Sequence, residues 1–509
     1  MEDLRLTMKT GSYFLLLSAA LSPACSPPMS EAEKLARVEQ VADELREIGF
    51  SIDMDRLAVR ELGSEEYLEE QRRRRLEVSP TVEASISGKA LFHILMRGGT
   101  SGDWEARVEG AFDRIPAASY SQEDEELTVL SDFGNLFGSS GILAHELGHA
   151  WRDQRSNLLS FQERAALTSD DFIAARLIEE GEAQLIAAAL LCQRNGVELQ
   201  ALPTTDLWEY GLEVNSGPFE SFLYNAGLAY AHQRFQEGGW EAVGASFDFE
   251  GLTSEQILHP TKVGKDLPTA VPLPEWPGSV DAAELLLENE AGEFLIACLL
   301  RDLDEESLEW REGAAGWDGD RVRVYQLADG TPLLLWRTVW DRSEDADQFE
   351  EALREAEMEP RRTSEQVVDL VRIGWRGGRT EEHDSLRGVL EEALSAVPCP
   401  VTADPAAAAA TADFEEELHL QRRRFPFGWK SWNHPVLGFA MSVPVGWIRD
   451  GKGFGQSLRR GGNVRHVEDE RVLLRAMGEI ENKESILAQL DEGTREELEE
   501  RLAEAASRE

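Results

Sequence analysis

Cysteine is scarce in this sequence of 509 residues, which contains only Cys25, Cys192, Cys298 and Cys399. No CxxC pair is present and the spacing is wide, so cysteines do not organise the fold. Long apolar runs are also lacking beyond the N-terminus, because no other stretch reaches the roughly 20 residues of a membrane span. The sequence contains no internal repeat. We therefore expect soluble globular domains, and the chain is long enough for two or three of them.

Basic side chains are strongly outnumbered, with 51 Lys and Arg against 96 Asp and Glu, which gives a formal net charge of −45. A chain this acidic repels phosphate backbones, so we expect no nucleic-acid partner. The charge is typical of a soluble protein, including one in a salty medium. An acidic cleft that selects basic substrates is the alternative interpretation.

The one apolar run, residues 13–21, is too short to span a bilayer but suits the core of a signal peptide, with Arg5 and Lys9 as its positive flank. Residues 21–25, Leu-Ser-Pro-Ala-Cys, then resemble a bacterial lipobox. We predict that residues 1–25 are a signal peptide, that Cys25 is lipidated, and that the exported protein meets the membrane only through this anchor. A plain cleaved signal with an incidental cysteine is the alternative, because Pro23 and the position of Leu21 depart from the pattern.

The composition along the chain changes several times, which suggests separate units. Charged residues with apolar positions at helical spacing predict a helical segment over residues 26–85. We expect a mixed unit over residues 86–278. It contains a strand at 126–130, a helix capped by Ser139 or Ser140, a helix near 169–193 and another after Pro218.

Prolines at 272, 274 and 277 mark the end of that unit. The strands expected at 322–327 and 333–338 flank Asp329-Gly330, a hairpin signal within a smaller α+β accessory unit, residues 279–397. An alanine-rich stretch predicts a linker at 398–420. Residues 421–509 then contain a strand at 438–443 and a charged helix from 483 to the end.

The segment His145-Glu146-Leu147-Gly148-His149 is an HExxH motif in an apolar helical pattern. Histidines four residues apart lie on one face of a helix, so both imidazoles can reach one ion, and neutral imidazole is a good zinc ligand. Glu146 lies about a quarter-turn round, where it can hold a water molecule and take its proton. Zinc lowers the pKa of that water to about 7. The alternative is a pair of surface histidines one turn apart.

Catalytic zinc needs a third protein ligand and an open fourth position. The HExxHxxGxxH spacing is absent, because Arg155 stands where a third histidine would be, so the ligand should come from another helix. The segment 176–184 offers Glu179, Glu180 and Glu182 within an otherwise apolar helix. Buried carboxylates need a partner, and a zinc ion is one. Solvated or salt-bridged acids are the alternative.

The helical wheel does not separate the three glutamates, because each shares its face with apolar residues. Glu180 is preferred because Gly181, Ala183 and Ala187 are small and leave room for the helix of the HExxH motif. We expect Glu182 to orient a group beside the metal.

The pairing of an HELxH helix with an E-G-x-A helix resembles gluzincin metallopeptidases. It is more closely similar to a set of secreted bacterial and archaeal proteins with three segments that here are His145–Gln154, Glu180–Ala183 and Thr253–Pro260. The resemblance extends over about residues 86–355, including the stretches 316–321 and 340–349, and departs at Glu182, where the set often has Asp. It implies a zincin-type metallopeptidase domain, with a mixed sheet and active-site helices, and Glu180 as the ligand before Gly181.

Peptide hydrolysis develops an oxyanion, which a Tyr or His donor beside the zinc would stabilise. The residues considered are Tyr224, Tyr230, His232 and His259. Tyr224 begins a Tyr-Asn-Ala-Gly stretch that resembles a recurrent Pro-Tyr-x-x-Gly of the same set, and His259 lies in the third shared segment. We assign the role to Tyr224 or His259. A hydrogen-bonded core residue is the alternative for each.

The sequence therefore predicts an exported zinc peptidase that acts on a peptide or protein. His145, His149 and Glu180 bind Zn²⁺, and Glu146 is general base and then general acid, so no acyl-enzyme forms. The rival hypothesis is a non-catalytic cell-surface binding or structural lipoprotein with a fold-stabilising zinc. Such a site fills all four positions with protein ligands and has no use for Glu146.

Overall fold

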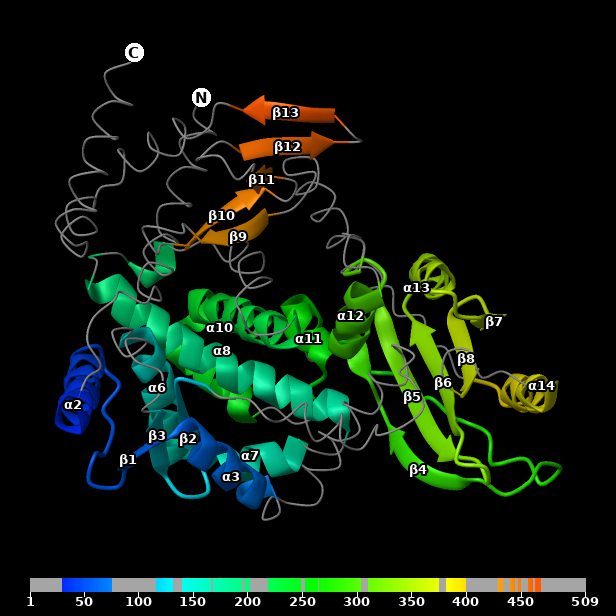
Figure 1. Ribbon diagram of the computed structural model, residues 1–509, viewed down its shortest axis with the longest axis horizontal. Coiled ribbons are helices and arrows are strands. Elements are labelled where there is room, and N and C mark those ends of the chain that lie inside the picture. The colour runs from blue at the N-terminus through cyan, green and yellow to red at the C-terminus, as the bar shows by residue number, and fades with distance from the viewer. Residues whose placement is uncertain are drawn as a thin grey trace.

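The computed structural model contains both helices and sheets, which confirms the α+β class (Figure 1). Within the parts of the chain that it describes, no helix combines the length and the apolar character needed to cross a bilayer. The described residues are 30–75, 116–130, 140–165, 168–194, 196, 198–201, 218–248, 252–263, 265–303, 310–374, 381–399 and five strands between 429 and 467.

Several predicted features lie outside the described residues. They are the signal peptide with Cys25, the capping Ser139, the linker from residue 400 onward and the helix over 483–509.

A small three-stranded sheet packs against the helix of the HExxH motif. Its order is β1-β3-β2, with β1 parallel and β2 antiparallel to the central strand. The strand predicted at 126–130 is confirmed as β3. In contrast, β1 lies within the segment predicted as helical. This stretch is too short to show a strand periodicity in sequence, and it forms a strand because it pairs with β3. The elements are α2 (Glu31–Glu47), β1 (Ala58–Leu62), α3 (Ser64–Arg75), β2 (Ala118–Ser121) and β3 (Glu126–Leu130).

Helix α2 begins with a capping box, which explains where it starts. The Ser30 N–H donates to the Glu33 carboxylate at 2.7 Å, and the Ser30 hydroxyl accepts from the Glu33 N–H at 3.4 Å. Val38, Val41 and Leu45 then point inward and are buried with apolar residues of the small sheet and of the motif helix, α6 (Ser140–Ser156). The helical spacing predicted for this stretch is therefore confirmed.

The predicted helices of the mixed unit are confirmed as α6 (Ser140–Ser156), α8 (Ser169–Arg194) and α10 (Pro218–Ala245), with α7 (Leu158–Ala165) between the first two. The capping role predicted for Ser140 is wrong. Ser140 is already the first helical residue, and its hydroxyl accepts a hydrogen bond of 2.6 Å from Arg37 of α2. The bond ties α6 to α2 at the start of the motif helix.

Helices α6, α8 and α10 approach one another at small residues. A Cβ on Gly181 of α8 would lie 2.1 Å from the carbonyl oxygen of Gly227 in α10, and a Cβ on Gly227 would lie 2.4 Å from that of Leu177. On the other side of α8, a Cβ on Gly148 of α6 would come within 3.3 Å of the Cα of Ala183. The expectation that Gly181 faces the motif helix is therefore wrong: Ala183 faces α6, whereas Gly181 faces α10.

The second part of the chain is an antiparallel sheet of order β4-β5-β6-β8-β7 with helices on both faces. The predicted hairpin is confirmed as β5 and β6, and its turn contains Gly330 with φ +84° and Asp329, which accepts from the Thr331 N–H at 2.9 Å. The elements are α11 (Ser254–Leu258), β4 (Glu284–Asn289), α12 (Gly292–Leu303), β5 (Trp317–Gln326), β6 (Pro332–Trp340), α13 (Ser343–Glu355), β7 (Arg361–Ser364), β8 (Val367–Ile373) and α14 (Glu381–Ala396).

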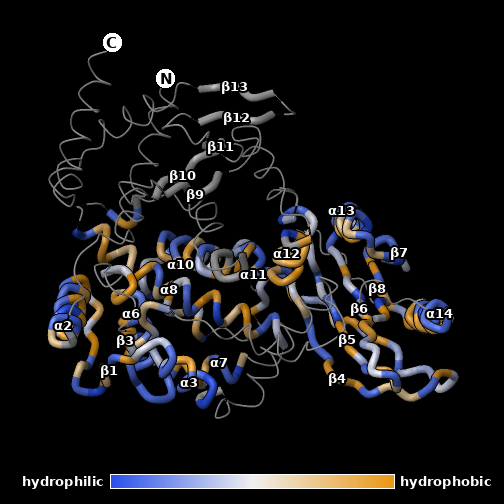
Figure 2. The backbone as a smooth tube through the Cα atoms, viewed as in Figure 1, coloured by the Kyte–Doolittle hydropathy of each residue, from blue (hydrophilic) through white to orange (hydrophobic). Residues whose placement is uncertain are grey.

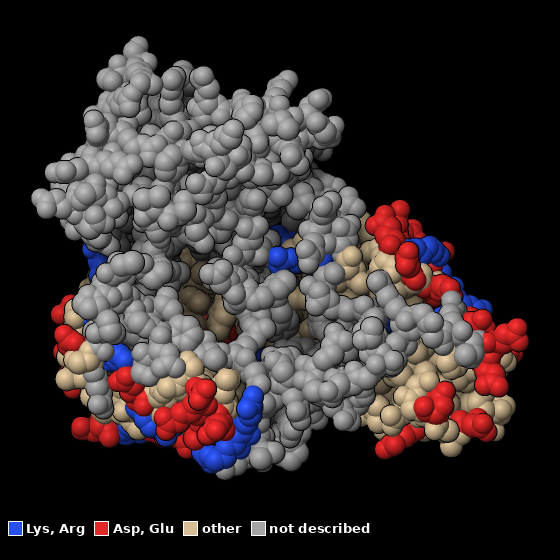
Figure 3. Space-filling view, viewed as in Figure 1, with Lys and Arg blue, Asp and Glu red and all other residues tan. Residues whose placement is uncertain are grey.

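Alternate residues of the central strands enter two different cores. Leu334 and Trp336 of β6 pack with α12 and α13, whereas Leu333 and Leu335 pack with α14. Figure 2 shows this concentration of hydrophobic residues in α12 and the central strands. On the outer surface acidic side chains gather over α13 and α14 (Figure 3), as expected for a solvated face, and the exposed acids there include Glu344, Asp347, Glu381, Glu382 and Asp384.

The largest apolar core runs across the predicted boundary at residue 278. Ile173 and Leu177 of α8 belong to the same buried cluster as Phe294 and Leu295 of α12 and Trp336 of β6. In Figure 1, α8 extends from the helical part toward the five-stranded sheet. The two predicted units therefore share a core through α8.

Near the C-terminus five short strands form two antiparallel sheets. The strand predicted at 438–443 overlaps β10. The strands are β9 (Trp429–Asn433), β10 (Ala440–Pro444), β11 (Trp447–Arg449), β12 (Gln456–Arg460) and β13 (Asn463–Val467).

Candidate metal centre

Helix α6 presents the two histidines of the motif on one side, as the four-residue spacing requires. Their Nε2 atoms lie 3.1 Å apart, and each side chain is nearly buried. Another face of the helix is also buried, because Leu143, Ala144 and Leu147 pack with apolar residues of α2 and the small sheet. The alternative of two surface histidines is therefore wrong.

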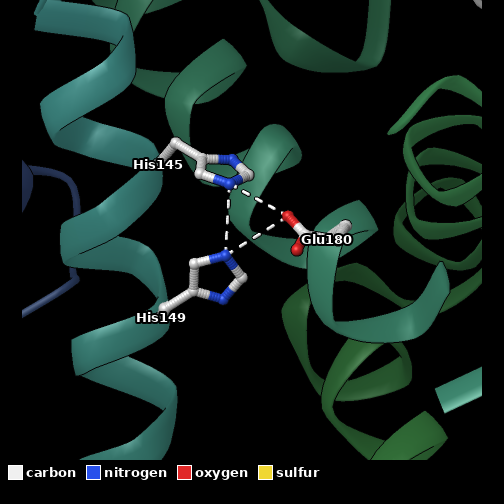
Figure 4. Close-up of side chains that lie close together, drawn as sticks. All are labelled: His145, His149 and Glu180. Atoms are coloured by element: carbon white, nitrogen blue, oxygen red, sulfur yellow. Dashed lines mark hydrogen bonds and ion pairs between the residues drawn. The ribbon is translucent and has the colours of Figure 1, made fainter. Parts of the chain in front are cut away.

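Glu180 of α8 completes a triangle with the two imidazoles (Figure 4). Its Oε2 atom lies 3.0 Å from His145 Nε2 and 3.3 Å from His149 Nε2. A tetrahedral ion with ligands at about 2.0–2.1 Å separates those ligands by about 3.3 Å, so the three atoms have the spacing of a tetrahedral zinc site. Oε2 makes no well-aligned hydrogen bond, although Glu180 is buried. An unsatisfied acceptor facing two imidazole nitrogens fits a cation between them.

The surroundings of the triangle favour an ionised carboxylate. Burial alone would raise the pKa of Glu180, but the guanidinium of Arg176 and the imidazole of His149 hold it well below its usual range. Burial likewise opposes the charged form of His149, yet electrostatic attraction to Glu180 raises the pKa of His149 to about 9. The cluster thus favours added positive charge.

A simple charge count points the same way. Glu146, Glu179 and Glu180 contribute three carboxylates and Arg176 one guanidinium, and all four interact electrostatically with the imidazoles or with each other. In the protonation state that metal binding requires, with neutral histidines and ionised acids, the cluster would lack two positive charges. Buried charges need compensation, and a divalent cation supplies it.

Arg176 is a member of the site that was not expected, and Glu179, considered above only as an alternative ligand, is bound to it. Arg176 donates from Nη2 to Glu180 and from Nη1 to Glu179, the latter at 2.9 Å. Glu179 also accepts from Gln162 of α7 at 2.8 Å and from Gln122, just after β2, at 3.1 Å. The spacing of Arg176 three and four residues before the two glutamates was the available signal, because such pairs are neighbours on a helix.

Glu146 lies on α6 beside the triangle and is held by the small sheet. Its Oε2 atom accepts from the backbone N–H of Tyr120 in β2 at 2.8 Å. The Tyr120 hydroxyl also donates to Asp153, two turns along α6, at 2.8 Å, so β2 is fixed along the helix. Burial raises the pKa of Glu146, against the opposing influence of the histidines. Sequence gave no signal for Tyr120, because a backbone N–H is present whatever the side chain.

Among the residues considered for the oxyanion, Tyr224 lies beside the triangle. Its ring centroid is 5.8 Å from that of His145 in an edge-on arrangement, and its side chain is half-buried. Tyr224 stands three residues before Gly227, so the close contact of α8 and α10 brings it to the site.

The other three residues are bonded elsewhere in the core. His259 pairs with Glu293 of α12 at 2.8 Å, and both are buried. The Tyr230 hydroxyl lies 3.1 Å from that of Ser246, and His232 Nε2 lies 3.1 Å from the Leu199 carbonyl oxygen. Each of the three therefore has a partner of the kind that the bonded-core interpretation expects, and the catalytic role of His259 stays a prediction.

Glu182 has a different partner from the one predicted. It accepts from Arg152 of α6, with an Nε–Oε2 distance of 2.6 Å, and so forms a buried ion pair between the two helices. Arg152 is not a member of the triangle, so in this structure Glu182 links α6 to α8, and the orienting role expected for it stays a prediction.

A second group of carboxylates, Glu255, Asp266 and Asp341, has its own cation. The buried Lys262 ammonium lies 2.5 Å from Glu255 and 2.6 Å from Asp341, with Asp266 at 3.2 Å. Burial opposes the charged lysine, but attraction to Glu255 and Asp341 raises its pKa. Lysine therefore occupies the position that a metal would take, unlike in the His145 cluster.

Comparison with known proteins addresses the second part of the chain. A family model described as a domain of unknown function, DUF8575, matches residues 284–388, from the start of β4 into α14. The match falls within the predicted accessory unit and does not include His145, His149 or Glu180. No curated protein and no solved structure matches the chain.

Proposed function

We propose that this protein is a zinc-dependent peptidase of gluzincin type, with His145, His149 and Glu180 as the metal ligands. The convergence of two imidazole nitrogens and one carboxylate oxygen within 3.3 Å carries the proposal. In the described part of the chain no fourth His, Cys, Asp or Glu joins this group. Three protein ligands with a free position are typical of catalytic zinc, whereas structural zinc takes four.

Glu146 supports hydrolysis rather than a structural role. A bound zinc ion would supply a nucleophile by lowering the pKa of a water molecule to about 7. Glu146 would accept the proton of that water and return it to the leaving amine. The bond of 2.8 Å from the Tyr120 N–H to one carboxylate oxygen fixes the side chain through both transfers.

Tyr224 is the proposed donor to the developing oxyanion, since its ring lies against that of His145. Removing its hydroxyl as Tyr224→Phe should lower kcat by about 10²–10³-fold, the usual cost of one such donor, with KM and zinc content little changed. Steady-state kinetics on a cleaved peptide measure this. Tyr230→Phe is the matched control on the same helix: it loses a core bond to Ser246 and should keep kcat. An unchanged kcat in Tyr224→Phe would remove Tyr224 from the mechanism.

A peptide-library digest with the purified full-length protein tests the proposal directly. Cleavage should stop when a chelator removes the metal and return when Zn²⁺ is added, because the nucleophile depends on it. Mass spectrometry of the products also gives the cleavage preference. Cleavage that persists after complete metal removal, or a protein that retains no zinc, would contradict the proposal.

We further propose that the protein is exported and held at the membrane by lipid on Cys25. The support is the lipobox-like sequence that ends at this cysteine. Fractionation of cells that make Cys25→Ser should move the protein from the membrane to the soluble fraction, because the acyl anchor is lost. Cys192→Ser is the control and should stay with the membrane. Membrane retention of Cys25→Ser would show that the anchor is not there.

A further inference from the structure

Arg176 lies one helical turn before Glu180 and bonds the oxygen that does not face the histidines. Its Nη2 atom donates to Glu180 Oε1, whereas Glu180 Oε2 faces His145 and His149. The Arg176 side chain is 30% exposed and that of Glu180 is 3% exposed, so Arg176 reaches solvent whereas the carboxylate that it bonds is buried.

We propose that Arg176 is a positioning residue that fixes the orientation of Glu180 and limits it to one metal-binding oxygen. This inference rests on the proposed function, because it assumes a metal at the triangle. A carboxylate that is free to rotate can offer either oxygen or both. With Oε1 engaged by a charge-assisted hydrogen bond, Glu180 presents only Oε2 to the position between the imidazoles. When Glu180 binds through one oxygen, the protein supplies three ligand atoms and leaves a position for water.

The guanidinium is itself fixed by a second carboxylate. Nη1 donates to Glu179 at 2.9 Å, and Glu179 is held in turn by the amides of Gln162 at 2.8 Å and Gln122 at 3.1 Å. The support for Glu180 therefore reaches α7 and the end of β2. Arg176 serves both glutamates because its planar fork carries two separate Nη atoms. A lysine ammonium on a flexible chain lacks this geometry, so charge alone should not replace it.

Metal affinity and the visible spectrum of bound Co²⁺ test this role in the full-length protein, with no reliance on activity. Co²⁺ replaces zinc in such sites and absorbs more strongly when four-coordinate than when five-coordinate. Competition with a chromophoric chelator should show a loss of about 10–100-fold in Zn²⁺ affinity for Arg176→Gln, the usual effect of removing an outer partner of a ligand. The Co²⁺ absorption should weaken, because the released Glu180 can bind through both oxygens.

Two further variants keep the test decisive. Arg152→Gln breaks the buried ion pair with Glu182 between α6 and α8. This variant should keep the native metal affinity and Co²⁺ spectrum. Arg176→Lys retains the positive charge that the buried glutamates need for folding, yet should still show weakened Co²⁺ absorption. Native affinity and spectrum in both Arg176 variants would overturn the positioning role alone. A wild-type protein that binds neither Zn²⁺ nor Co²⁺ would overturn the proposed function and this inference together.

Discussion

Replacing Glu146 by glutamine is expected to reduce peptide hydrolysis by at least about 10²–10⁴-fold, the usual contribution of a general base, while zinc binding and the fold are kept. Glutamine has nearly the same shape, and its amide oxygen can still accept from the Tyr120 N–H, which now donates to Glu146 at 2.8 Å. The amide cannot take a proton from water at neutral pH. The measurement is kcat on a peptide found in the library digest, together with the zinc content of the purified variant.

Glu182→Gln is a suitable control for this experiment, because it removes another carboxylate of the same helical part without touching the histidines. It should retain most activity, although it weakens the bond to Arg152. Equal hydrolysis by Glu146→Gln and the wild type would refute the proposed chemistry. Loss of zinc from Glu146→Gln would instead show that Glu146 acts as a ligand.

Removing the third ligand should have the largest effect on metal binding. Glu180→Ala is expected to lose more than about 100-fold in Zn²⁺ affinity, beyond the 10–100-fold typical of outer partners. The reason is that Glu180 Oε2 is the only carboxylate oxygen that lies within 3.3 Å of both imidazole nitrogens among the described residues. Isothermal titration with Zn²⁺ measures this, and thermal melts of the metal-free variants show whether each one folds.

The neighbouring glutamates supply the comparison. Glu182→Ala should bind zinc almost as wild type does, because its partner is Arg152. Glu179→Ala should fall between, since Glu179 hydrogen-bonds to Arg176, the partner of Glu180, and is not itself one of the three grouped ligands. If either of these variants lost zinc while Glu180→Ala retained it, the assignment of the third ligand would be wrong.

Local patterns in the sequence were enough to place the motif helix. The spacing of His145 and His149 in an apolar helical pattern predicted two imidazoles that the structure brings 3.1 Å apart, whereas the choice of Glu180 among three glutamates depended on the resemblance to gluzincins. The hairpin around Asp329-Gly330 was equally local. In each case the deciding information lies within a few turns of helix or a few residues of strand, where side-chain periodicity is a reliable guide.

Contacts between distant segments could not be predicted in this way. The pairing of Gly181 with Gly227, the bond from the Tyr120 backbone to Glu146, and the pair of His259 with Glu293 all depend on how helices and strands dock. A motif histidine and a core histidine look alike in sequence. Only the identity of the neighbour, supplied by another part of the chain, separates the two roles.

The shared core beneath α8 has a thermodynamic consequence. The same helix carries Glu180 to the metal triangle and sends Ile173 and Leu177 into the core formed with Phe294 of α12. Opening that core would release the metal ligand, so the two halves of α8 should unfold as one cooperative unit. An ion that binds only the folded state stabilises everything linked to it, in proportion to the logarithm of its free concentration. Metal binding at the triangle would thereby be coupled to the integrity of the sheet that begins at Glu284, so a substitution within that sheet should alter the metal affinity.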